Sequence, residues 1–155
     1  MSESYTLVPI GHVAGGRDEV RDDDWGRERA QIVLDASRFD AEALAGLDAF
    51  SHLEVVYLFD RVDPARVERA ARHPRGNEAW PRVGIFAQRA KDRPNRLGVS
   101  RCRLLGVEGL RVAVAGLDAV DGTPVLDIKP YMNEFAPQGP VHQPAWSSEL
   151  MAGYW

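Results

Sequence analysis

The chain has 155 residues, of which 45% are hydrophobic, with a formal net charge of −4 and a single cysteine. One cysteine excludes an internal disulfide and a thiolate metal cluster within one chain, and the apolar runs are far shorter than the roughly 20 residues of a membrane helix. We therefore expect one domain over residues 1–155 without a C-terminal extension domain, in a cytoplasmic protein with no membrane partner and no metal.

The first third of the chain predicts strands separated by polar segments. Residues 7–13 read as a first strand, and the acidic stretch 18–24 is too polar to pack, which indicates a solvated, mobile loop. Residues 30–35 alternate apolar and polar side chains with a period of two, which is typical of a half-buried strand. Asp40 is placed to cap a helix over residues 41–47.

The middle of the chain predicts a strand and a helix. Residues 52–59, HLEVVYLF, are rich in β-branched and aromatic side chains and predict a central strand. The pair Asp63-Pro64 predicts the start of a helix of about ten residues that Pro74 ends. Ser51 precedes His52, but neighbouring residues in a strand point to opposite faces, so we expect no nucleophilic dyad.

The second half predicts mainly strands. Residues 83–87 and 123–128 each read as a strand, and 100–107 is predicted to form a hairpin with 110–117 through the two-residue loop Glu108-Gly109. Five to seven strands with two short helices indicate a mainly β architecture, either a barrel or a strongly curved sheet. The sequence contains no GxGxxG motif and no alternation of strands with long helices. These absences argue against a doubly wound nucleotide-binding fold.

The C-terminal segment is unusually aromatic. Ser147 or Ser148 is placed to cap a brief terminal helix. Trp146, Tyr154 and Trp155 form more aromatic surface than a free tail normally carries. We expect them to dock on the body of the protein or on a second subunit.

Two segments carry charges within strand-like sequence. Residues 89–103 contain six basic residues and one acidic residue, Asp92. This is an excess of five positive charges in an acidic protein. Planar guanidinium groups suit carboxylates and phosphates, although a solvated basic loop is equally compatible with this composition. In the segment 116–132, aspartates lie in an apolar strand and need partners, which the arginines could supply in a purely structural pairing.

These residues also carry a family resemblance. PIGHV at 9–13, FSHLEVVYLFD at 50–60, RVGIFAQRAKDRPNRLGVS at 82–100 and GLDAVDGTPVLDIKPYM at 116–132 resemble, in order and spacing, the TrmO family, also called TsaA-like or YaeB-like. The resemblance implies a single-sheet β-barrel-like domain with two or three short helices that acts as a homodimer. It also implies S-adenosylmethionine-dependent N6-methylation of threonylcarbamoyl-adenosine beside the anticodon of tRNA.

The resemblance implies site residues position by position. The cofactor contacts fall on Asp60, Arg61, Arg89, Val99, Gly116, Leu117 and Asp118. The substrate contacts fall on Arg93, Asn95, Arg96, Lys129 and Tyr131. We expect Asp118 or Asp121 to place the cofactor or the acceptor amine as the catalytic carboxylate. Two other hypotheses are a methyltransferase that acts on a small metabolite and a non-catalytic, dimeric S-adenosylmethionine-binding module.

Overall fold

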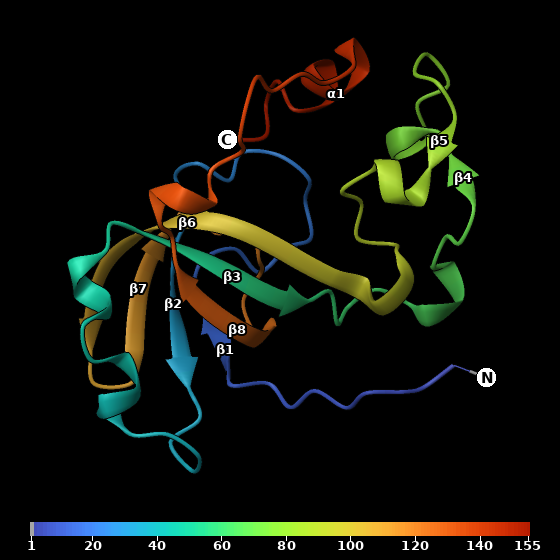
Figure 1. Cartoon of the computed structure of the whole chain (residues 1–155). Coiled ribbons are helices and arrows are strands. Elements are labelled where there is room, and N and C mark those ends of the chain that lie inside the picture. The colour runs from blue at the N-terminus through green and yellow to red at the C-terminus, as the bar shows by residue number, and fades with distance from the viewer. Residues whose placement is uncertain (1) are drawn as a thin grey trace.

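The computed structural model describes residues 2–155 and contains a closed six-stranded barrel (Figure 1). Every pair of neighbouring strands in the barrel is antiparallel, in the order β1-β2-β7-β6-β3-β8. The strands are β1 (Gly11–Ala14), β2 (Arg29–Leu34), β3 (His52–Leu58), β6 (Leu97–Glu108), β7 (Arg111–Ala115) and β8 (Pro124–Pro130). This confirms the mainly β, single-sheet barrel.

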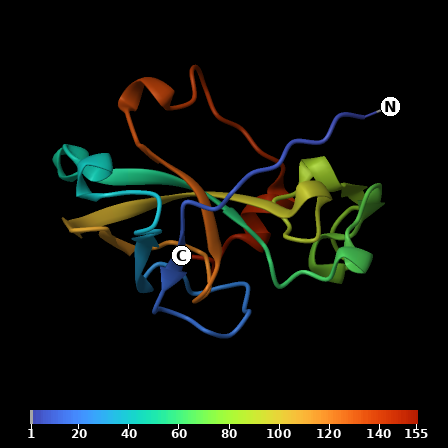
Figure 2. The same cartoon turned by 90° about the horizontal axis from the view of Figure 1, so that it is seen from below.

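A small lobe lies to one side of the barrel. Its two strands, β4 (Ala71–Arg72) and β5 (Val83–Gly84), pair only with each other. Figures 1 and 2 show that this lobe is joined to the barrel by the chain that leaves β3 and the chain that enters β6. The buried Gln88 side chain holds the lobe together, since its Nε2 donates to the carbonyls of Arg72 and Val83.

The helical segments are short. The 3-10 turns are η1 (Ala41–Leu44), η2 (Leu47–Ala49), η3 (Pro64–Arg66), η4 (Pro74–Gly76), η5 (Ile85–Ala87), η6 (Pro94–Arg96) and η7 (Asn133–Phe135), and the α-helix is α1 (Ala145–Leu150). Within residues 2–155, no helix is both long and apolar enough to span a membrane.

The period of two in the strand sequences fills the barrel. In β3, Leu53, Val55 and Tyr57 point inward and are at most 2% exposed, while the residues between them lie on the outer face. The inward residues of the other strands complete one core, which includes Val13, Ile32, Cys102, Val112, Val114 and Val125. Cys102 is one of these core residues and is 3% exposed.

Burial gives Cys102 a testable titration. Burial, with a smaller effect from the Asp118 charge, raises the pKa of the thiol from 9.0 to about 12. A raised folded-state pKa favours folding below the unfolded-state pKa, so this contribution is lost as pH rises from about 9 to about 12. We expect native protein at pH 8 to react with a thiol reagent far more slowly than urea-unfolded protein. Equal rates would contradict the burial of this thiol.

Several predicted elements differ in extent. The strand predicted over 7–13 contracts to β1, and the strand over 83–87 ends at Gly84 and continues as η5. The strand over 123–128 is present as β8. The helix over 41–47 is capped by Asp40 as expected, but it breaks into two 3-10 turns at Gly46, which has a φ of 83°.

The helix predicted after Asp63-Pro64 is wrong beyond its first turn. Asp63 caps Ala65, but the turn ends at Arg66 and Val67 is extended. The next amides find other acceptors: Glu68 N–H donates to the Asp92 carbonyl, and the Glu68 carboxylate accepts from the Ala70 amide. These bonds replace the i→i−4 bonds that a helix requires.

Three local assignments also need correction. The hairpin pairs Glu108 with Arg111, so its loop is Gly109-Leu110, one residue later than predicted. Helix α1 begins after Pro144, and both serines lie inside it. Ser51 lies before β3, so the alternation of side chains in a strand does not separate it from His52. Its Oγ lies 2.7 Å from Nδ1 of His52, in contrast to the prediction that the two side chains point apart.

Candidate active site

The carboxylate of Asp118 lies between two tyrosine side chains. Asp118 follows β7, and its Oδ1 accepts a 2.9 Å hydrogen bond from the Tyr57 hydroxyl, which reaches it from the barrel interior. Its Oδ2 accepts a hydrogen bond from the hydroxyl of Tyr154 near the C-terminus. Strand β3 and the last residues of the chain therefore meet at one acidic group.

Both phenols are hydrogen-bond donors that resist ionisation. Burial raises the pKa of Tyr57 and of Tyr154, and the negative charge of Asp118 raises both further. The positive charge of Arg89 opposes this shift at both tyrosines, which places its guanidinium in the same electrostatic neighbourhood. The site thus combines an anionic acceptor, two neutral donors and a cation.

Arg89 is positioned by strand β6. The residue follows η5, and its Nη2 donates a 2.7 Å hydrogen bond to the Val99 carbonyl. Val99 lies on the outer face of β6 and is 49% exposed. Two predicted cofactor positions, Arg89 and Val99, are therefore joined by a hydrogen bond, and the charge of Arg89 acts on the two tyrosines that hold Asp118.

Gly98 makes room for the tyrosine that reaches Asp118. It pairs with Tyr57 across β3 and β6, and a Cβ on Gly98 would lie 2.4 Å from a ring carbon of Tyr57. The Phe59 ring meets the Tyr57 ring edge-on with centroids 5.3 Å apart, and a ring carbon of Phe59 would lie 3.0 Å from the same Cβ. The added methyl group would therefore be crowded by both rings. Only a glycine, which has no Cβ, lets the two strands place the Tyr57 ring here without a clash.

We expect Gly98→Ala to lower the free energy of unfolding by about 1–3 kcal/mol, because the new methyl group overpacks a ring that cannot move freely. Urea denaturation measures the change. Gly106→Ala is the matched control, since a Cβ there would meet no atom within 4 Å. Equal effects of the two substitutions would contradict the proposed packing of Tyr57.

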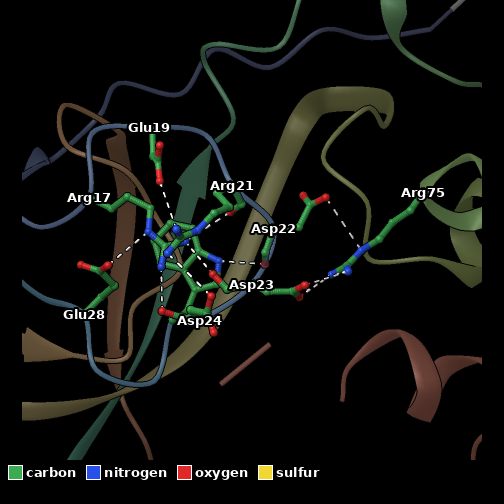
Figure 3. Close-up of polar contacts among 9 residues, drawn as sticks. Arg17, Glu19, Arg21, Asp22, Asp23, Asp24, Glu28 and Arg75 are labelled. Atoms are coloured by element: carbon green, nitrogen blue, oxygen red, sulfur yellow. Dashed lines mark hydrogen bonds and ion pairs between the residues drawn. The ribbon is translucent and has the colours of Figure 1, made fainter. Parts of the chain in front are cut away.

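Arg17 organises the acidic loop beside the site (Figure 3). Its side chain is 4% exposed, forms an ion pair with Glu28 at 3.1 Å and donates to the carbonyls of Asp23 and Asp24. Its guanidinium also stacks 3.8 Å from the ring centroid of Trp25. The side chains of residues 18–24 are mostly exposed, as predicted for a solvated loop, but the buried Arg17 side chain bonds to the backbone of this loop, which the sequence did not predict.

The acidic loop is also tied to the side lobe and to the C-terminal segment. Arg75, in η4, makes a two-bond ion pair with Asp23, with N–O distances of 2.8 and 3.2 Å (Figure 3). The amides of Asp24 and Trp25 donate to the carbonyls of Gly153 and Tyr154 at 3.0 and 2.8 Å. The loop therefore fixes the segment that carries Tyr154.

Asp121 and Arg61 form a second cluster. Asp121 Oδ1 accepts a 2.8 Å hydrogen bond from the Gly15 amide, and its carbonyl accepts from Arg61 Nη2 at 3.0 Å. Arg61 also pairs with Asp18 at 3.3 Å. The backbone amide of Asp121 donates to the Arg17 carbonyl. These bonds give Asp121 a role in joining loops, whereas Asp118 faces the tyrosines.

The remaining cofactor positions lie on turns. Asp60 is exposed after β3, Gly116 has a φ of 76°, and Leu117 is 2% exposed within the core cluster. Leu117 anchors the chain immediately before Asp118, and the positive φ of Gly116 sets the turn that leaves β7.

The basic segment supplies structural bonds from several guanidinium groups. Arg93 donates to the carbonyls of Gln88 and Ala90, and Arg96 donates to the Val62 carbonyl at 2.9 Å. Pro94 and Asn95 form the η6 turn between these arginines, and Asn95 has a φ of 63°. Arg89 and Arg93 thus take different partners.

A further polar group lies on the outer face of the barrel. Arg101 pairs with Glu54 at 2.7 Å and stacks over the Tyr131 ring with its guanidinium 4.8 Å from the centroid. Lys129, which is opposite Glu54 across β3 and β8, lies 3.6 Å from the Asp127 carboxylate. Two of the predicted substrate positions, Lys129 and Tyr131, therefore accompany Arg101 rather than Asp118.

Sequence analysis missed the two tyrosines as site residues. The sequence places Tyr57 in a predicted central strand and predicts that Tyr154 docks on the body or on a second subunit, without a site role for either. A signal was available for Tyr57, because a strand residue with a polar tip needs a partner when it is buried. In the part of the chain that the structure describes, residues 2–155, no group of three His, Cys, Asp or Glu side chains is arranged to hold a metal ion.

Solved structures share this architecture. A crystal structure of TrmO from Pseudomonas aeruginosa aligns with a TM-score of 0.73 at 29% identity, covering 94% of this chain and 63% of that one. The fold is therefore that of a TrmO-like β-barrel protein. Residues 23–136 match the tRNA-methyltransferase O N-terminal domain, which is more than half of the chain. The protein belongs to the TrmO family.

Relatives with longer chains carry functional names. The P. aeruginosa protein named "Putative S-adenosylmethionine-dependent methyltransferase RcsF" is 45% identical over 140 residues, which cover 83% of this chain and 58% of the relative. The tRNA (adenine(37)-N6)-methyltransferase of Escherichia coli is 41% identical over 107 residues, covering 66% of this chain and 45% of the relative. The chain spans about half the length of these relatives.

Proposed function

We propose that the protein binds S-adenosylmethionine at the Asp118 site and methylates N6 of an adenosine beside the anticodon of a tRNA. Family membership and the names of the E. coli and P. aeruginosa relatives support this activity. The observation that carries it is the Asp118 carboxylate, held by two tyrosine hydroxyls in the electrostatic neighbourhood of Arg89. A threonylcarbamoyl-adenosine is the acceptor that the family resemblance favours.

The chemistry of the site fits the proposed cofactor. The cofactor carries an ammonium group and ribose hydroxyls, which a carboxylate such as Asp118 can accept from, and a carboxylate that the guanidinium of Arg89 can bind. The turn at Gly116, with its positive φ, lets the backbone approach a ligand closely. Asp60, Arg61, Val99 and Leu117 complete the proposed cofactor contacts.

The proposed catalysis depends chiefly on positioning. The bound cofactor supplies an electrophilic methyl group on a sulfonium. Asp118, fixed by its tyrosines, orients groups around the reacting centre, and holding reactants in line can supply a large part of a rate enhancement. Asp121 contributes by joining the loop after β1 to the loop before β8. We assign removal of the proton from the acceptor amine to Asp118, because this carboxylate lies between Tyr57 and Tyr154 at the proposed cofactor site.

The proposed tRNA contacts are Arg93, Asn95 and Arg96 on the η6 turn and Lys129 and Tyr131 on the outer face. Arg93 and Arg96 keep their positive charge while they donate to backbone carbonyls. Tyr131 offers an aromatic surface beside Arg101. Contacts of this kind to phosphates release counterions, so tRNA affinity should fall steeply with salt.

We also propose a cytoplasmic homodimer. The outer face of β6 exposes Leu97 and Val99 opposite Leu58 and Val56 of β3, which forms an apolar patch next to the basic residues. Exposed apolar patches commonly mark interfaces. Sedimentation velocity should give the mass of a dimer, and Leu97→Asp should shift the protein toward the mass of a monomer.

A methyl-transfer assay tests the proposed activity. Protein, S-adenosylmethionine labelled in its methyl group and tRNA lacking the modification are incubated, and digested nucleosides are separated to locate the label. We expect label on a threonylcarbamoyl-adenosine, with less transfer as salt rises. Cofactor binding without labelling of tRNA would favour a small-metabolite acceptor. The net charge of −4 and the bonds of Arg93 and Arg96 to backbone carbonyls are consistent with an acceptor other than a polyanion. Cofactor binding with no label in tRNA or in a small metabolite would favour the non-catalytic S-adenosylmethionine-binding module.

A further inference from the structure

The C-terminal segment is built into the candidate site. Trp80 Nε1 donates a 2.7 Å hydrogen bond to the Glu149 carboxylate of α1, which joins the helix to the side lobe. Gly26 lies so close to Trp155 that a Cβ there would be 2.8 Å from the Trp155 carbonyl carbon. With the two backbone bonds from the acidic loop, these contacts hold the segment at three places. Figure 1 shows α1 between the barrel and the β4–β5 lobe.

The Tyr154 hydroxyl is not needed for this docking. The bonds from the Asp24 and Trp25 amides reach the backbone of residues 153–154, and the Trp80 bond reaches Glu149. The ring of Tyr154 also packs edge-on against Trp155, with centroids 4.9 Å apart. What the hydroxyl adds is one hydrogen bond to Asp118 Oδ2.

That hydrogen bond completes the fixation of a functional carboxylate. Tyr57 holds only Oδ1, so without Tyr154 the carboxylate could rotate about the bond to its Cβ. With one donor on each oxygen, its orientation is fixed while further lone pairs stay free to accept from a ligand. Two surface cavities, one lined by residues such as Pro9 and His12 and one by residues such as Ala14 and Gln31, include no residue of this site.

We propose that Tyr154 is a positioning residue for the cofactor: its hydroxyl orients Asp118 so that the carboxylate accepts from a hydroxyl or ammonium group of S-adenosylmethionine. This inference rests on the proposed function. It assigns the C-terminal segment of the chain a direct part in cofactor binding, through Asp118.

The test is titration calorimetry with S-adenosylmethionine on the whole chain, comparing three variants. Tyr154→Phe removes only the hydroxyl and should raise the Kd roughly 5- to 20-fold, as expected for loss of a hydrogen bond to a charged group. Tyr5→Phe removes the hydroxyl of an exposed tyrosine bonded to Glu3 and should leave the Kd unchanged. Trp80→Phe removes a tail anchor without touching Asp118 and should change the Kd less than Tyr154→Phe.

The outcomes separate this inference from the proposed function. A wild-type protein that binds no cofactor would remove both. Wild-type binding with an unchanged or tighter Kd in Tyr154→Phe would overturn the positioning role alone, and a tighter Kd would mean that the hydroxyl competes with the ligand. An equal loss in Trp80→Phe would assign the effect to tail docking and would also overturn it. Thermal unfolding of each variant confirms that the titrated protein is folded.

Discussion

Replacing Asp118 with alanine is expected to weaken S-adenosylmethionine binding by roughly 10- to 100-fold, the range for loss of hydrogen bonds to a charged group. The carboxylate is the one acceptor on which β3, the β7–β8 connection and the C-terminal segment converge. Its removal takes away the ligand contact and leaves the hydroxyls of Tyr57 and Tyr154 to rearrange. Isothermal titration measures the change in Kd.

The matched control for this substitution is Asp48→Ala. Asp48 is an exposed aspartate in η2 and is not one of the residues that contact Asp118. Its removal changes the net charge equally and should leave the Kd unaltered. If Asp118→Ala bound the cofactor as tightly as Asp48→Ala, the assignment of Asp118 to the cofactor would be wrong.

The second large effect is expected at Arg17. We expect Arg17→Met to lower the free energy of unfolding by about 3–5 kcal/mol, because it breaks a part-buried ion pair with Glu28 and removes a guanidinium that is 4% exposed. It also removes the donor that gathers the carbonyls of Asp23 and Asp24 and the cation that stacks on Trp25 (Figure 3). Chemical denaturation followed by tryptophan fluorescence measures this loss.

Arg21→Met is the control for Arg17→Met. Its side chain is 51% exposed and pairs with Glu19 and Asp24 at 3.3 and 3.7 Å. Exposed ion pairs contribute little, so we expect a change below about 1 kcal/mol. Similar losses in both variants would show that burial does not distinguish the two arginines and would contradict the role of Arg17 as the centre of the loop.

The sequence allowed the barrel to be predicted because its strands follow a simple rule. Alternating side chains in residues 30–35 and the β-branched and aromatic content of residues 52–59 identified β2 and β3, whose inward residues are almost fully buried. Helices were harder to predict, because the bonds that end η3 come from Asp92 and from the Glu68 side chain. The sequence pattern after Asp63 contains no sign of these bonds.

The site was predictable only in part, for a similar reason. Family resemblance pointed to Arg89, Val99 and Asp118, and the structure associates them. Tyr154 lies 36 positions from Asp118 along the chain, and their contact depends on the acidic loop that Arg17 gathers. The aromatic residues at 146, 154 and 155 predicted docking on the body or on a second subunit, but the acidic loop looked too polar to be the surface that receives them.

The most direct test of the account is titration of S-adenosylmethionine into the wild-type protein, with Arg89→Ala in parallel. Arg89 donates to Val99 and its charge acts on the tyrosines that hold Asp118, so we assign its guanidinium to the carboxylate of the cofactor. We predict saturable one-site binding that is lost or strongly weakened in the variant. Absence of saturable binding to the wild-type protein, or identical binding by the two proteins, would contradict the proposed cofactor site.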